Sequence, residues 1–367
     1  MTLYKNRMIY RFICMALVVC LFIVSDPVNV YAKGGSSKIE NETGTESGNK
    51  TESSIESETD TADEDQEANG NVIEFVYGNL LYYIDMETST AVLGGSISEK
   101  LTALNIPSVI VYNETEIPVT AIGDYAFLES SLTSVSLGKN ITMIGEGAFA
   151  YSDELVKVTI NKKCSEIGDA AFLMCGALKS VKISKKAKTK SIGEGAFAGT
   201  AIKSFAIPNA TVKIGDAAFG ECEKLTTFTI GNKLKEIGEG AFAGCNALNT
   251  VKKSKKNKYF DVEENLIYSK GFSELISAAA ASGDVKLNEE TEYISSRAFE
   301  GNSRIVTVEI PENVLSVGEC AFMNCSSLET VILDGGMIEM DENVFYGCPK
   351  FSEIRLGNVS DDVVPVG

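Results

Sequence analysis

Apolar residues in this chain return in a fixed order about every 23 residues. Each unit has a segment of the form Ile-Gly-acid-x-Ala-Phe and then a short run of the form Leu-x-x-Val-x-Ile. A period of this length is in the range of leucine-rich repeats and well below that of propeller blades or helical-pair repeats. The phenylalanine of the first segment recurs at Phe127, Phe149, Phe172, Phe197, Phe219, Phe242, Phe299, Phe322 and Phe345.

One such unit cannot fold alone, because burying its few apolar side chains stabilises less than ordering its backbone costs. Stacked units share a continuous core and a parallel strand ladder, which is how solenoids become stable. In the second run, positions one, four and six are apolar in nearly every repeat, with Lys253 as the exception at position six. This pattern places positions four and six inward on a strand. It predicts a solenoid with a parallel β-sheet on one face and short helical turns and loops on the other.

The glycine and the acidic residue of the first segment have separate expected roles. We expect the glycine, from Gly123 to Gly318, to occupy a tight turn with positive φ. The acidic residue should begin a short helical turn and accept hydrogen bonds from its free N–H groups. A calcium-binding ladder is the alternative, but one carboxylate per repeat supplies too few ligands. The acidic positions are Asp124, Glu146, Asp169, Glu194, Asp216, Glu239, Glu319 and Glu342.

The first 71 residues lack the repeat. Three basic residues precede an apolar run at 12–24, which predicts a signal peptide over residues 1–32. A retained membrane anchor is the alternative, although the run is short of the ~20 apolar residues that a span needs. Residues 33–71 hold 11 acidic residues and 3 lysines among Ser, Thr, Gly and Asn. Such a composition predicts a disordered acidic linker.

The remainder divides into a cap and an array. Residues 72–120 contain short strand-like runs without the repeat pattern, as expected for an N-terminal β cap of a solenoid. Residues 121–367 form the predicted array, with an enlarged repeat at about 252–293. There the runs 265–268 and 275–276 read as strands joined by a hairpin turn at 269–271. We interpret this insert as part of the same array; a separate small domain is the alternative.

Composition excludes several kinds of chemistry. The chain has no histidine, which removes His-based triads, general bases and metal ligands. A net charge of −18 disfavours wholesale binding to DNA or RNA. No catalytic constellation, cofactor motif or CxxC metal spacing occurs, so we expect a non-catalytic protein without cofactor or metal. Stacked cysteines three residues after the repeat phenylalanine have parallel Cβ vectors, which predicts mostly free thiols: Cys175, Cys222, Cys245, Cys325 and Cys348.

The motif Ile-Gly-[Asp/Glu]-x-Ala-Phe-x-x-Cys-x-x-Leu, followed by Val-x-Ile, resembles the BspA-like leucine-rich repeat family. The resemblance covers about 72–356, including the enlarged segment. That family is common on bacterial surfaces and also expanded in trichomonads. The resemblance implies a secreted or surface-displayed recognition protein that adheres to host matrix proteins or other cells. No stable membrane span is expected after signal cleavage.

Positions two, three and five of each strand run should face outward, where lysine and threonine gather in the middle of the array and glutamate near its end. We expect this face to bind a protein ligand or an anionic glycan, with charge steering the approach. The alternative is that the lysines only keep an exposed sheet soluble. A structural envelope component and an accessory module of a secreted glycosidase are further alternatives. The candidate residues are Lys157, Thr159, Lys179, Lys182, Lys203, Thr227, Thr229, Lys252, Glu309 and Glu329.

Overall fold

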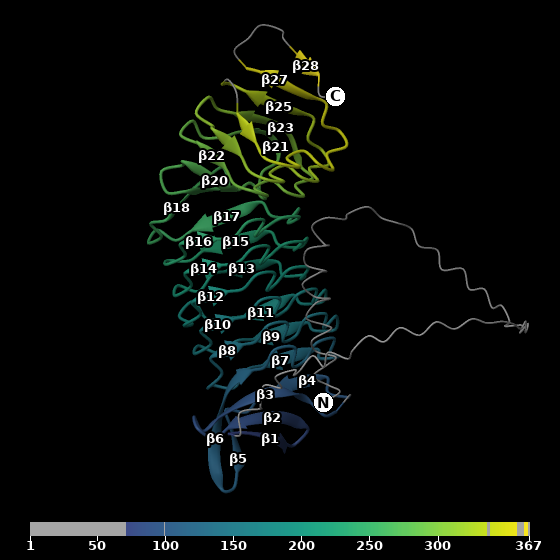
Figure 1. The fold of residues 1–367 in the computed structure, drawn as a ribbon, viewed down its shortest axis with the longest axis vertical. Coiled ribbons are helices and arrows are strands. Elements are labelled where there is room, and N and C mark those ends of the chain that lie inside the picture. Colours follow the sequence, from purple (N-terminus) through teal and green to yellow (C-terminus); the bar gives the residue numbers. More distant parts are fainter. Residues whose placement is uncertain (1–70, 99, 336–337, 358–362, 366–367) are drawn as a thin grey trace, which may run out of the picture. The chain divides into compact units, whose positions relative to one another are not determined.

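The computed structural model describes residues 71–367 except 99, 336–337, 358–362 and 366–367. The predicted signal peptide at 1–32 and all of the predicted linker but Asn71 lie outside the described residues. The structure consists of stacked coils (Figure 1). Each regular coil contributes one face strand, one shorter back strand and a loop that holds the repeat phenylalanine. The predicted solenoid with a parallel sheet on one face is confirmed.

The back strands continue a small mixed sheet at the N-terminal end. This sheet comprises β1 (Val72–Tyr77), β2 (Leu80–Asp85), β3 (Thr90–Ser96) and β6 (Thr115–Ile122), with β5 (Val109–Tyr112) paired to β6. Among these strands β3 and β6 pair in parallel, and the other pairs are antiparallel. Parallel back strands follow in the order β8 (Met143–Ile144), β10 (Glu166–Ile167), β12 (Ser191–Ile192), β14 (Lys213–Ile214) and β16 (Glu236–Ile237). Beyond β16 they resume in a second sheet as β20 (Glu274–Ser277), β22 (Tyr293–Ile294), β24 (Ser316–Val317) and β26 (Glu339–Met340).

The face strands form three consecutive sheets. The first holds β4 (Ala103–Asn105), β7 (Ser134–Ser136), β9 (Lys157–Thr159) and β11 (Ser180–Lys182). The second holds β13 (Ser204–Ala206), β15 (Thr227–Ile230) and β17 (Thr250–Lys253). The third holds β21 (Gly283–Lys286), β23 (Ile305–Ile310), β25 (Thr330–Leu333), β27 (Glu353–Leu356) and the antiparallel β28 (Val363–Pro365).

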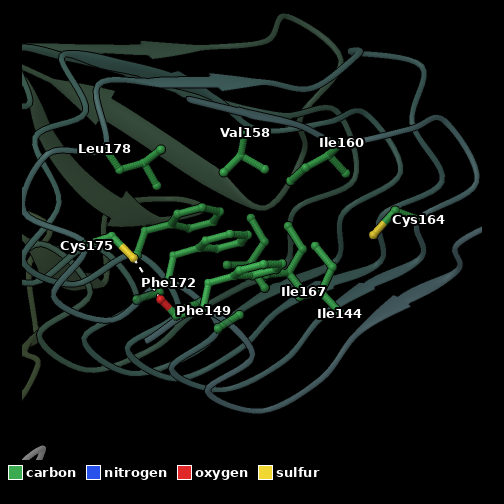
Figure 2. Close-up of a cluster of buried hydrophobic side chains, with 14 of the residues drawn as sticks. Ile144, Phe149, Val158, Ile160, Cys164, Ile167, Phe172, Cys175 and Leu178 are labelled. Atoms are coloured by element: carbon green, nitrogen blue, oxygen red, sulfur yellow. Dashed lines mark hydrogen bonds between the residues drawn. The ribbon is translucent and has the colours of Figure 1, made fainter. Parts of the chain in front are cut away.

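Side chains of the same type lie above one another because the coils stack in register. Ile167 of β10 pairs with Ile144 and Ile192 on the neighbouring back strands, and all three are buried. The phenylalanine rings from Phe127 to Phe242 stack nearly parallel, with centroids 5.2 to 5.9 Å apart. Figure 2 shows two of these rings between the back-strand isoleucines and the face-strand side chains. Every coil therefore completes the core of its neighbours.

The predicted short helical turns are wrong, since the described residues contain no helix. It follows that no helix among these residues could cross a membrane. The acidic residues consequently do not cap helices. Instead the Asp169 carboxylate accepts a hydrogen bond from the backbone N–H of Glu194 on the next coil, at 2.8 Å. Asp124 and Asp216 make the same bond to the next coil. The carboxylate thus forms a hydrogen bond between two coils, whereas the prediction had it accept hydrogen bonds within its own coil.

The glycine after the isoleucine also has a different role from the predicted one. Positive φ occurs two residues later, at positions such as Tyr125, Ala170 and Gly195. The glycines themselves mark the closest approach of two coils. A Cβ atom on Gly145 would lie 2.5 Å from Asp124 Oδ1 and 2.7 Å from Asp124 N. Glycine is needed there because any side chain would collide with the preceding coil.

The insert forms a meander of three antiparallel strands, β18 (Phe260–Glu263), β19 (Leu266–Ser269) and β20. The strand β18 was not predicted, and Asn265 lies in the β18–β19 turn, where it was expected to begin a strand. The central strand β19 is buried on both sides. Ile267 packs into the core of the N-terminal half, whereas Leu266 and Tyr268 pack into the core of the C-terminal half. The strand β19 is thus a wall, here called the septum, between two half-cores.

The loops on either side of the insert contact each other directly, without the septum between them. The backbone N–H of Gly244 donates to the carbonyl oxygen of Glu300 at 3.1 Å, and Asn246 Oδ1 accepts from the N–H of Ser303 at 2.9 Å. These residues belong to the coils of Phe242 and Phe299, on either side of the insert. On the loop side the two coils are therefore direct neighbours, and the inserted residues are accommodated among the strands.

Candidate binding face

The candidate residues all lie on or beside the face strands, and none of them is buried. They include Lys157 and Thr159 on β9, Lys182 on β11, Thr227 and Thr229 on β15, Lys252 on β17 and Glu309 on β23. Lys179, Lys203 and Glu329 each lie one residue before a face strand. The alternation of the strands leaves these side chains on the outer surface, since the residues between them point into the core.

The register places hydroxyl side chains beside the lysines of the first sheet. Lys157 lies between Ser134 and Ser180 on the neighbouring strands. One row further along, Lys182 is paired with Thr159. Alternation of ammonium and hydroxyl groups avoids direct repulsion between like charges across the strands. The arrangement also offers hydrogen-bond donors and acceptors next to each positive charge.

The structure does not bring all the candidate residues together. The lysines lie on the first two sheets, whereas Glu309 and Glu329 lie on the third sheet, beyond the septum. Glu309 is already engaged in an ion pair with Lys286 at 3.0 Å. The hydrogen bonds that the Lys286 ammonium group donates to Glu289 and Glu309 raise the pKa of Lys286. The two glutamates are therefore separate from the lysine-rich part of the face, and one of them has a partner within the protein.

More lysines border the same face at two turns between a face strand and the following back strand, those after β9 and β11. Lys188 donates its backbone N–H to the carbonyl of Lys162 one coil earlier, so these turns stack as the strands do. We call this border the lysine corner; it comprises exposed Lys162, Lys163, Lys185, Lys186, Lys188 and Lys190. Lys162 and Lys163 were not singled out from the sequence, because only the stacking of the turns shows that they join the later lysines.

Lys253, the exception to the repeat at position six, is not part of this face. It occupies the inward position that Ile230 fills one coil earlier, and its ammonium group lies 3.0 Å from the carboxylate of Asp261. Lys270 reaches the same carboxylate at 2.8 Å. Burial of Asp261 raises its pKa, but hydrogen bonds from Gly271, Lys270 and Lys253 outweigh burial and lower the pKa to about 2. The departure of Lys253 from the repeat pattern thus marks a part-buried ion triad.

The opposite edge of the back strands is acidic. A groove of about 450 Å³ there is lined by at least one carboxylate from each of the coils that border it, including Glu146, Asp169 and Glu194. Burial, and then the charges of Asp216 and Asp169, raise the pKa of Glu194. Within the described residues, no group of three or more Cys, Asp or Glu side chains has the geometry of a metal site. In the coils of β9 and β11, a basic edge beside the face is therefore opposed by an acidic edge beyond the back strand.

The seven cysteines of the described chain are all free thiols. Six of them are buried and Cys348 is half-buried. Burial raises the pKa of Cys175 to about 12, so this thiol is protonated at neutral pH. The regular spacing of these residues consequently supplies no disulfide within the described part of the chain.

Comparison with known proteins identifies the repeat. Residues 100–204, 190–264 and 267–362 match the model of the BspA type leucine rich repeat region, in six copies. No curated protein matches the chain.

Three solved structures of other proteins share this fold. A leucine rich cell surface protein from Faecalibacterium prausnitzii is 23% identical, with a TM-score of 0.56 over 77% of this chain and 88% of that one. A leucine-rich repeat protein from Eubacterium ventriosum is 21% identical, with a TM-score of 0.54 over 78% of each chain. The pneumococcal vaccine antigen PcpA is 16% identical, with a TM-score of 0.53 over 78% of this chain and 82% of that one.

Parallel coils with one phenylalanine ladder and one outward-facing sheet define a leucine-rich repeat solenoid. The chain belongs to the BspA-type leucine-rich repeat family.

Proposed function

We propose that this protein is a secreted or cell-surface recognition protein. It binds an acidic protein segment or an anionic glycan through the lysine-rich part of its face and has no catalytic activity. The observation that carries the proposal is the gathering of exposed lysines on the first two face sheets and the lysine corner of a chain whose net charge is −18. Such local positive charge steers an anionic partner and excludes others.

The relatives support the setting of this activity. The Faecalibacterium protein is described as a cell surface protein, and the solenoid of this chain spans most of its length. Export would proceed through the predicted signal peptide at 1–32. Mass spectrometry of the mature protein tests this step, because cleavage there gives an N-terminus at Lys33. A partner on a host matrix or on another cell is consistent with such a location.

Charge reversal on the face tests the binding. We expect the triple variant Lys157→Glu, Lys179→Glu and Lys203→Glu to lower affinity for heparin and polyglutamate at least about tenfold, equivalent to ~1.4 kcal/mol. The matched control reverses Lys213, Lys224 and Lys350, which lie on the back strand and the loops. It changes the net charge equally. Equal losses of affinity in the face triple and the control triple would show that only the net charge matters. Unchanged binding of heparin and polyglutamate by the face triple would show that the face lysines serve solubility only.

A further inference from the structure

A second concave surface lies on the back of the molecule, where the insert interrupts the parallel back strands. The strand β16 ends the first back sheet, whereas β20 has β19 and β22 as its neighbours. The space between β16 and the β20–β22 pair is a groove of about 540 Å³, here called the junction groove. Its size is within the range of ligand sites, and such sites are frequent where two packed units meet.

The repeat sequence changes at this groove. In regular coils the back-strand isoleucine is followed by glycine and an acidic residue, as in Gly238 and Glu239 at one wall of the groove. The register of β20 with β22 places Ile276 and Ser295 at the glycine position. Ser296 takes the acidic position in the second of these coils. The acidic edge is therefore interrupted here by hydroxyl and aliphatic side chains.

An apolar strip with one exposed aromatic ring crosses the groove. Ile237 and Ile276 are half-buried in it, whereas Ile214, the equivalent of Ile237, is fully buried in its coil. Tyr293 stands at the wall with 44% of its surface exposed. The ammonium group of Lys235 lies 5.2 Å from the ring centroid of Tyr259, beside the groove. An exposed tyrosine next to aliphatic carbon offers a flat, apolar platform with a polar tip.

The polar groups of the groove are nearly balanced in charge. Glu236, Glu239 and Glu274 line it together with Lys235, and Lys213 forms an ion pair with Glu236 at 3.8 Å. The three carboxylates and Lys235 leave two net negative charges on the lining, and Lys213 beside Glu236 reduces this to one. A polyanion therefore gains little here, and a polycation gains less than it would along the uninterrupted acidic edge. The carboxylates accept hydrogen bonds and the serine hydroxyls both donate and accept.

We propose that the junction groove binds a neutral oligosaccharide. A pyranose ring has an apolar C–H face that fits the tyrosine and isoleucine strip, and a rim of hydroxyls that can donate to Glu236, Glu239 and Glu274. Addition of a peptide strand is disfavoured, because the free edge of β16 is only two residues long. This activity is separate from the proposed function of the face, which takes an anionic partner on the other side of the coil.

Calorimetric titration of the full chain with chitotetraose, cellotetraose and maltotetraose tests the proposal. We expect at least one of these sugars to bind saturably with a millimolar dissociation constant. The Tyr293→Ala variant should bind that sugar at least about tenfold more weakly. Tyr346→Ala is the matched control, because Tyr346 is 59% exposed but does not line the groove. Lack of binding by all three sugars overturns the proposal, as does equal binding by the two variants. Binding of oligolysine in place of the sugars, lost in Tyr293→Ala, would make the groove a cation site and also overturn it.

A second variant guards against misfolding. Ser296→Glu restores the acidic residue of the regular repeat, so it should fold as the regular coils do and still abolish sugar binding. The two proposals are tested independently. The Lys157, Lys179 and Lys203 triple should retain sugar binding, and Tyr293→Ala should retain heparin binding.

Discussion

The Cys175 thiol donates a hydrogen bond to the backbone carbonyl oxygen of Phe149, one coil earlier, at 3.1 Å (Figure 2). Ser152 does the same for the carbonyl of Phe127. The position three residues after the repeat phenylalanine is therefore a donor position that satisfies a buried carbonyl between coils. The same bond is made by Cys222 to Phe197, Cys245 to Phe219, Cys325 to Phe299 and Cys348 to Phe322.

Removal of this donor should cost more than exchange of its sulfur for oxygen. We expect Cys175→Ala to lower the free energy of unfolding by about 0.5–1.5 kcal/mol, because the Phe149 carbonyl loses one of its two hydrogen bonds and keeps only that from the Ser152 N–H at 3.2 Å. Cys175→Ser should cost less, as Ser152 already makes this bond in the preceding coil. Denaturant unfolding of both variants measures the difference. A larger loss for Ser than for Ala would show that sulfur packing, and not the hydrogen bond, selects cysteine.

The glycine after the back-strand isoleucine should not tolerate even alanine. At Gly145 the new methyl group would meet the backbone of the preceding coil, so Gly145→Ala should cost about 1–3 kcal/mol through overpacking. Gly176→Ala is the control, because no atom lies within 4 Å of a Cβ there. Thermal unfolding should show a clear loss for the first variant and little change for the second. Equal effects would mean that the glycines act through the unfolded chain instead.

The ion triad at the septum predicts a loss of stability in acid. The pKa of Asp261, about 2, is below the value of 3.8 that it has when unperturbed, so the stabilisation is present above pH 4 and lost as pH falls towards 2. Its size is roughly 2 kcal/mol. Asp261→Asn should remove this part of the acid dependence and destabilise the protein at pH 7. Urea unfolding between pH 2 and 7 provides the measurement; parallel pH profiles for the two proteins would contradict the assignment.

The raised pKa of Glu300 predicts the opposite pH dependence of stability, with a loss as the pH rises. Burial raises its pKa from 4.5 to about 7; Arg297, 3.1 Å away, opposes the shift and the charge of Glu221 adds to it. A raised carboxyl pKa means that the stabilisation is full below pH 4.5 and lost as pH rises through 7. The difference is on the order of 3 kcal/mol. Glu300→Gln should flatten this part of the profile between pH 5 and 8 in urea unfolding. A wild-type slope retained in the variant would assign the effect to other groups.

The sequence predicted the strands and core because each coil repeats the same inward positions. Val158 and Ile167, for example, pair with equivalent residues on both sides. It assigned the wrong roles to the glycine and the acidic residue, because the partner of the glycine lies on the preceding coil and that of the acidic residue on the next coil, and periodicity within one repeat shows neither. Lys253 was the one visible sign of the septum, but its partner Asp261 follows in an irregular segment. The junction groove arises from the same interruption and has no motif of its own.

The septum has a consequence for how such a protein can change in length. Because Ile267 faces one half-core while Leu266 and Tyr268 face the other, β19 closes the end of each half with the same strand. The strand β19 therefore covers the apolar end of both half-cores. Coils gained by duplication or lost by deletion in one half would leave β19 in contact with the core of the other half. The lengths of the two halves can therefore evolve separately.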